Sequence, residues 1–323
     1  MRFNFKRTVL AAVIALVSVF TVFSSPSAEV RIGVLKGPTG IGASYLLSQN
    51  EEGKTLNKYS VTVLAEATDM IAQVAAGQLD IAALPTNAAS SLYNKMSGGV
   101  RIAALNTAGV LYILEKGNTV NSVADLKGRT IYAVGQGSNP EYVLRYILSK
   151  NGIDPDKDVT ISFLDSAELT TRAATGDIDV CMLPVPAVTT VLIKNKDMRI
   201  ALDMTQQWDA LGTGSILTMG CMVVRTEFLK EHPLEVRAFL SDYEKSIEYV
   251  KNNVAEAGEL CAKYAIVPAA AVATKAIPDC NLIFVSGSAV KDSLEGYLQV
   301  LYDSNPKSIG GNMPGADFYT LTI

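Results

Sequence analysis

The stretch Gly77-Gln-Leu-Asp-Ile-Ala-Ala-Leu-Pro85 returns 99 residues later as Gly176-Asp-Ile-Asp-Val-Cys-Met-Leu-Pro184. The two copies share the glycine, the aspartate and the Leu-Pro pair. At the same offset, Ile32–Thr39 matches Ile131–Ser138. Roughly a hundred residues is far longer than a solenoid repeat. The repeat predicts two similar lobes that face each other across a cleft, where a ligand would bind.

Both copies alternate short β-branched segments with helical ones, a pattern typical of βαβ units. In the first copy we expect strands at Val30–Leu35, Val61–Ala65, Ile81–Leu84 and Ile102–Leu105, and helices at Gly40–Ser48, Thr68–Ala76 and Asn87–Lys95. In the second copy we expect strands at Ile131–Val134, Val159–Phe163, Val180–Leu183 and Ile200–Leu202, and helices at Pro140–Asn151, Ala167–Thr175 and Ala187–Ile193. The predicted fold class is α/β, with two lobes that each contain a mostly parallel sheet flanked by helices.

Two crossings between the lobes are expected. Val110–Glu115 enters the second lobe, and a strand at Cys221–Val224 returns from it. The tail after the return has no counterpart in the repeat, and we expect it to pack on the first lobe as helices at Pro233–Asn252, Val254–Tyr264, Ala269–Ala276 and Val290–Asp303. The predicted organisation is a leader at 1–28, a first lobe at 29–108 and 218–323, and a second lobe at 109–217. A two-strand hinge of this kind suits closure around a ligand.

Residues 1–28 have the pattern of a secretory signal peptide. Arg2, Lys6 and Arg7 precede the apolar segment Val9–Phe23, and small residues follow up to Ala28. Cleavage near Ala28 predicts a periplasmic or secreted protein. The alternative is an uncleaved anchor, which is less favoured because the apolar stretch falls short of the roughly 20 residues that span a bilayer. No cysteine ends the apolar stretch, so a lipoprotein is not predicted.

Charge and cysteine content exclude several classes of protein. Without the leader, 25 basic residues stand against 32 acidic ones and no basic run remains, so neither nucleic acid nor an anionic membrane is an expected partner. The single histidine, His232, and the wide cysteine spacing predict no metal, no cofactor and no catalytic triad. Cys261 and Cys280 are spaced to meet across a helical hairpin and are candidates for a disulfide after export. Cys181 and Cys221 are expected to be inert buried thiols.

The candidate ligand-binding residues lie at strand ends, because ligands of open α/β sheets bind beyond the carboxyl ends of the strands. Two glycine-bearing loops lead from strands into helices, where free N–H groups favour anionic or carbonyl oxygens; a tight turn alone is the alternative. Thr86 or Asn87 either caps a helix or contacts the ligand, and aromatic residues can stack on a flat ligand. The candidate set is Lys36, Gly37, Pro38, Thr39, Gly40, Thr68, Asp69, Thr86, Asn87, Asn106, Tyr112, Gln136, Gly137, Ser138, Asn139, Glu141, Pro184 and Trp208.

Several of these segments resemble the substrate-binding proteins of bacterial ABC importers, in particular the nitrate, sulfonate and taurine group, which includes binders of thiamine-pyrimidine precursors. The resemblance rests on Leu35–Gly40, Asp80–Asn87, Asp125–Gly128, Gly135–Leu144 and Asn305–Gly311. It implies a type II periplasmic-binding-protein fold with the ligand between the lobes, and delivery to a permease with its ATPase. The chain has Val185-Pro186 where many relatives carry Glu-Pro, so a polar contact from that position is not expected.

The resulting expectation is an exported, monomeric solute-binding protein with no enzymatic activity. It would capture a small polar, anionic or heteroaromatic solute. Two alternatives stay open: an enzyme on the same fold, such as a lyase or dehydratase, and a ligand sensor for a membrane receptor. The enzyme branch that makes the thiamine pyrimidine is disfavoured, because its histidine and clustered cysteines are absent from the sequence.

Overall fold

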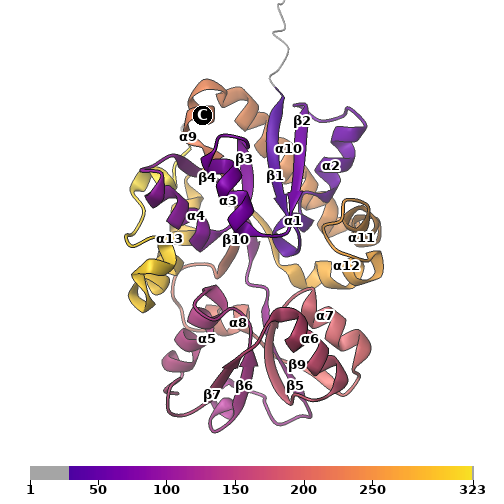
Figure 1. Cartoon of the computed structure of the whole chain (residues 1–323), viewed down its shortest axis with the longest axis vertical. Helices are drawn as coiled ribbons and strands as arrows, with labels where there is room; N and C mark the ends of the chain where they lie inside the picture. The colour runs from indigo at the N-terminus through magenta and orange to yellow at the C-terminus, as the bar shows by residue number, and fades with distance from the viewer. Residues whose placement is uncertain (1–28, 322–323) are drawn as a thin grey trace, which may run out of the picture.

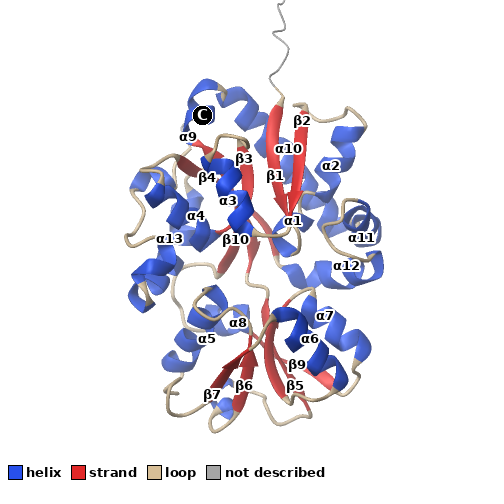
Figure 2. Ribbon diagram, viewed as in Figure 1, coloured by secondary structure: helices blue, strands red, loops and turns tan. Residues whose placement is uncertain are grey.

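The chain folds into two lobes stacked along its long axis, each built on one sheet flanked by helices (Figures 1 and 2). The structure is a computed structural model that describes residues 29–321. The predicted signal peptide, with its cleavage site, lies outside the described residues. No helix within residues 29–321 is long and apolar enough to cross a membrane.

The first lobe contains a six-stranded sheet in the order β11–β4–β10–β3–β1–β2. β1 is parallel to β2 and to β3, whereas β10 is antiparallel to its neighbours β3 and β4, and β11 is antiparallel to β4. Strands β1 to β4 therefore all point the same way. The strands are β1 (Val30–Leu35), β2 (Tyr59–Leu64), β3 (Ile81–Pro85), β4 (Val100–Ala108), β10 (Thr218–Arg225) and β11 (Leu282–Ser286).

The second lobe contains a five-stranded sheet in the order β7–β6–β8–β5–β9. Only β5 runs antiparallel to its neighbours, β8 and β9. Without β11, the first sheet has the same strand order, with β10 in the position of β5. The predicted α/β fold with mostly parallel sheets is confirmed, and the sequence repeat extends to topology. The strands are β5 (Leu111–Lys116), β6 (Thr130–Ala133), β7 (Thr160–Phe163), β8 (Val180–Pro184) and β9 (Met198–Asp203).

Most helices lie within one or two residues of their predicted bounds. The first sheet is flanked by α1 (Pro38–Ile41), α2 (Ser44–Glu51), α3 (Ala67–Ala75), α4 (Thr86–Lys95), α9 (Thr226–Glu231), α10 (Pro233–Asn252), α11 (Val254–Lys263), α12 (Ala270–Ala276) and α13 (Ala289–Ser304). The second has α5 (Asn139–Lys150), α6 (Ser166–Thr175), α7 (Ala187–Lys194) and α8 (Met204–Asp209). Short 3-10 turns are η1 (Val123–Leu126), η2 (Ile277–Cys280), η3 (Pro306–Ile309) and η4 (Ala316–Phe318).

Four features differ from the sequence prediction. The helices α8 and α9 and the strand β11 were not predicted. The helix predicted at Gly40–Ser48 is two helices, α1 and α2, separated at Gly42. A side chain at Gly42 would come within 2.9 Å of Ile247 on α10. The helix therefore breaks at the point where this segment packs closely on α10.

The lobes touch beyond the two crossings between them. The Asn305 amide, just after α13, donates to the Tyr142 hydroxyl on α5 at 2.9 Å. The ring of Tyr297 on α13 lies 5.6 Å from the ring of Trp208 on α8. One helix of the tail thus packs against two helices of the second lobe.

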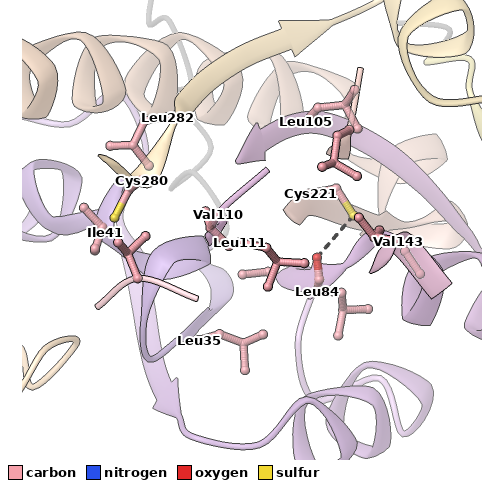
Figure 3. Packing of buried hydrophobic residues seen from close by; sticks show 14 of the residues in the cluster. Leu35, Ile41, Leu84, Leu105, Val110, Leu111, Val143, Cys221, Cys280 and Leu282 are labelled. Atoms are coloured by element: carbon pink, nitrogen blue, oxygen red, sulfur yellow. Dashed lines mark hydrogen bonds between the residues drawn. The ribbon is translucent and has the colours of Figure 1, made fainter. Parts of the chain in front are cut away.

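The core near the crossings is apolar and closely packed (Figure 3). Leu84, Leu105 and Cys221 come from β3, β4 and β10, and all three are fully buried. The Cys221 thiol donates to the Leu84 carbonyl at 3.5 Å, and burial raises the pKa of this thiol. As predicted from its strand-like surroundings, Cys221 is a buried free thiol, and so is Cys181.

Cys261 on α11 and Cys280 in η2 are also buried free thiols in this structure. Burial and, after it, the charge of the nearby Cys261 raise the pKa of Cys280. The two side chains therefore share one environment without being bonded here, and the disulfide stays a prediction.

Candidate functional site

A cavity of about 760 Å³ lies between the two lobes and is lined by residues from both. Its size is within the usual range for small-molecule sites, about 300–1,000 Å³. The carboxyl ends of β3 and β8, at Pro85 and Pro184, both reach it. Because these two strands are equivalent in the repeat, the cavity lies where the two copies face each other.

The loop after β1 forms part of the first-lobe wall through Pro38 and Thr39. Gly37 has a φ of 87°, which favours glycine, and proline follows at the first turn of α1. A side chain at Gly40 would come within 1.8 Å of the Leu35 carbonyl oxygen. Gly40 thus lets α1 pack on the end of β1, and this places Pro38 and Thr39 at the cavity.

The equivalent loop of the second lobe contributes Ser138, Asn139 and Pro140. Gly135 has a φ of 78°, and the Ser138 hydroxyl donates to the Gly135 carbonyl at 2.7 Å. Asn139 is only 4% exposed, and its side-chain oxygen has no hydrogen-bond partner among the described residues. The loop therefore presents an unpaired polar group at the start of α5.

The ends of β3 and β8 differ in chemistry, as the mismatch between the copies predicts. Asn87 lines the cavity on the first-lobe side, whereas Thr86 is buried and its hydroxyl donates to the Thr218 carbonyl at 2.8 Å. On the second-lobe side the lining residues are Val185 and Pro186. Polar contact at this level is available from Asn87, and the opposite wall is apolar.

Seven of the candidate residues line the cavity: Pro38, Thr39, Thr68, Asn87, Ser138, Asn139 and Pro184. Two other candidate residues, Asn106 and Tyr112, lie behind the lining and make contacts that support it. The buried Asn106 amide donates to the Thr39 carbonyl at 3.1 Å and to the Tyr243 hydroxyl at 2.9 Å. The Tyr112 hydroxyl donates to the Asp279 carbonyl at 2.9 Å, which ties β5 to η2. Tyr112 is thus an inter-lobe contact and does not line the cavity.

The remaining candidates lie elsewhere. Lys36, Asp69, Gln136 and Gly137 are exposed and outside the lining. Trp208 was expected to stack on a ligand, but it is fully buried, and its indole N–H donates to the Ser215 carbonyl at 2.9 Å. Its place in the aromatic core between α5 and α13 explains the difference.

Sequence reasoning missed the apolar side of the cavity. Ile71 on α3, Leu111 on β5 and Met219 on β10 line it, together with Pro268 and Val272 from the tail. Leu111 is the first residue of β5 and Met219 the second of β10, so the position of the two predicted crossings indicated both residues. The two tail residues reach the cavity only through tertiary packing, which no local pattern indicates.

Of the described residues that line the cavity, none is acidic, basic or aromatic, and histidine is absent too. Within residues 29–321, no group of three or more metal-ligand side chains gathers. His232 lies at the start of α10, where its ring stacks on Phe228 at 4.8 Å. The lining offers hydroxyl and amide groups for binding and no side chain that would exchange a proton near neutral pH.

Comparisons with known proteins find a matching family and a curated relative. The sequence profile described as NMT1/THI5-like matches residues 60–257. A protein of Brucella abortus (strain 2308), described only as a binding protein, is 24% identical over 272 residues, which is 84% of this chain and 82% of that protein.

Solved structures share the fold. An ABC transporter protein from Parabacteroides distasonis superposes with a TM-score of 0.78 at 24% identity, covering 91% of this chain and 99% of that one. The periplasmic aliphatic sulphonate binding protein SsuA from Escherichia coli gives 0.69 at 17% identity, covering 88% and 91%. These likenesses confirm the predicted type II periplasmic-binding-protein fold.

Proposed function

Because the chain belongs to the NMT1/THI5-like family, we propose that it is an exported, monomeric solute-binding protein. In this proposal it captures a small molecule between its lobes and delivers the molecule to the permease and ATPase of an ABC importer. The observation that carries the proposal is the inter-lobe cavity of about 760 Å³, lined from both copies of the repeat. The lobes are joined by two crossings, so their separation can change while each sheet stays intact.

The lining also supports binding over catalysis. Hydroxyl and amide groups hold a solute, and the apolar walls contribute through burial of its surface. Capture and release need a change in the distance between the lobes, and contacts such as Asn305 to Tyr142 connect them at one side. An enzyme on this fold would need a proton-transferring side chain at the cavity, and none of the described lining residues is one.

The proposal is tested by thermal shift on the mature protein against a broad panel of metabolites. A ligand at 100 times its dissociation constant stabilises the folded state by about 2.7 kcal/mol, which raises Tm by a few degrees for a protein of this size. Ala88→Phe places a ring inside the cavity and should abolish that rise.

The matched control is Ala72→Phe, on the exposed side of α3 and outside the cavity lining. This variant should keep the ligand response of the parent protein. A panel in which no compound stabilises the protein contradicts the proposed function. A response that survives Ala88→Phe unchanged would place binding outside the inter-lobe cavity.

A further inference from the structure

The inter-lobe cavity also limits the kind of solute. Resting on the proposed function and deepening it, we propose that the solute is uncharged, with an aliphatic body and hydroxyl, carbonyl or amide groups. Three features carry this: glycine loops in which the N–H groups of Gly37, Gly40, Gly137 and Ser138 are already engaged, acidic groups at the starts of α5 and α6 beside the cavity, and a lining without charged or aromatic side chains.

In the glycine loop of the second lobe, the donors of Gly137 and Ser138 are bonded to the chain itself. The Gly137 N–H donates to a carboxylate oxygen of Glu141 at 2.7 Å. The N–H and the hydroxyl of Ser138 both donate to the Gly135 carbonyl, at 3.0 and 2.7 Å, and Pro140 has no N–H. The loop that looks in sequence like an anion cradle therefore already holds an anion, the side chain of Glu141.

The glycine loop of the first lobe is engaged in the same way. The Gly37 N–H donates to the Ile266 carbonyl at 2.9 Å, and the Gly40 N–H donates back to the Gly37 carbonyl at 3.0 Å. Pro38, between them, has no N–H to offer. Of this loop, Thr39 is left to make polar contact with a solute.

The charges at the starts of α5 and α6 oppose an anion. The Glu141 side chain is 14% exposed and pairs with Arg145, and that guanidinium also pairs with Asp156, both at 2.7 Å. One positive charge thus pairs with two negative ones, so these three side chains of α5 and the loop after it carry a net charge of −1. At α6, the Asp165 carboxylate accepts from the N–H of Ala167 at 2.8 Å. A solute anion near either helix start would meet a carboxylate already in place.

What the cavity does offer suits a neutral solute. The hydroxyls of Thr39, Thr68 and Ser166 line it and can donate or accept. The unpaired side-chain oxygen of Asn139 lies in the same wall. A charged group enters such a lining at a large desolvation cost without a counter-charge, whereas an amide or hydroxyl group exchanges its water for these partners.

The first experiment measures binding of matched pairs to the mature protein by isothermal titration calorimetry. Each pair shares one body and differs in charge: hexanoate with hexanamide, butanesulfonate with butanesulfonamide, and benzoate with benzamide. We expect each neutral aliphatic member to bind at least about tenfold more tightly than its anion, and hexanamide more tightly than benzamide. Anions that bind as tightly as their neutral partners would overturn the inference about the solute and leave the proposed function standing. If no member of any pair binds and no compound of the broad panel raises Tm, the proposed function itself fails.

The second experiment changes the charge that excludes anions. Glu141→Gln keeps an oxygen to accept from the Gly137 N–H but removes the negative charge, so butanesulfonate should bind about fivefold more tightly than to the parent protein. Glu231→Gln, at an exposed position outside the cavity lining, makes the same change in net charge and should leave the affinity unaltered. Equal butanesulfonate affinities in Glu141→Gln and the parent protein would contradict the role assigned to this carboxylate.

Discussion

Glu115 is a buried carboxylate on β5 that stabilises the second lobe. It is 1% exposed and accepts from the N–H groups of Thr119 and Val120 and from the Arg199 guanidinium at 2.8 Å. Burial raises the pKa of Glu115, but these hydrogen bonds outweigh it and lower the pKa from 4.5 to about 2. The carboxylate therefore stabilises the fold above pH 4.5, and this contribution is lost as pH falls toward 2.

Glu115→Gln should lower the free energy of unfolding by about 2 kcal/mol at pH 7, because charge-assisted hydrogen bonds become neutral ones. The difference in the free energy of unfolding between the variant and the parent protein should be smaller at pH 2.5. Urea titrations at both pH values measure it, with the exposed Glu231→Gln as the control that stays at the parent value. A gap of the same size at both pH values would rule out the charge as its cause.

Single residues at the candidate site could be predicted only in part. Ser138 and Asn87 follow strand ends, and the rule for parallel sheets places both at the cavity. Lys36 and Asp69 also follow strand ends, those of β1 and β2, yet lie exposed outside it, because the direction of a side chain after a strand depends on packing. Trp208 follows the end of β9, but its ring is drawn into the core by aromatic neighbours that are distant in sequence.

At the scale of elements, α11 and η2 hold Cys261 and Cys280 in one buried environment. We predict that folding in the presence of oxidised glutathione joins the two thiols, which give up two electrons and two protons to the glutathione disulfide. A bridge across these 19 residues contributes about 3 kcal/mol, chiefly by restricting the unfolded chain. Reduction should therefore lower Tm.

The readout is mass spectrometry after alkylation of the denatured protein. Oxidised protein should take up two alkyl groups, and reduced protein should take up four. Cys181→Ser is the control, because Cys181 lies on β8 of the other lobe and its loss should leave the bridge intact. Four alkyl groups on protein folded under oxidising conditions would show that the thiols do not pair.

Elements with strong local signals could be predicted, and those fixed by tertiary contact could not. The strand β1 and the helix α10 lie at their predicted bounds, since alternation or a proline start defines each. The strand β11 is half-buried at one edge of the first sheet, where it pairs only with β4. Its five residues have no counterpart in the repeat, so neither periodicity nor the duplication marked them.

At the scale of the whole molecule, the strand order has a consequence for the sequence of folding events. The five strands of the second lobe come from one continuous stretch, β5 to β9. In the first lobe, β10 lies between β3 and β4, so this sheet stays split until residues 218–225 arrive from beyond the second lobe. Closing that gap joins segments more than a hundred residues apart. The loss of chain entropy comes before the new contacts stabilise the sheet.

The second lobe should therefore act as the folding nucleus of the chain, and the first lobe should close last. Pulse-labelling hydrogen exchange during refolding should find the amides of β6 and β8 protected before those of β3 and β4. Simultaneous protection of both sheets would refute this order. If the chain crosses a membrane with its N-terminus leading, the first lobe would then stay incomplete until the second lobe had folded. During this interval the protein would be most accessible to proteases and chaperones.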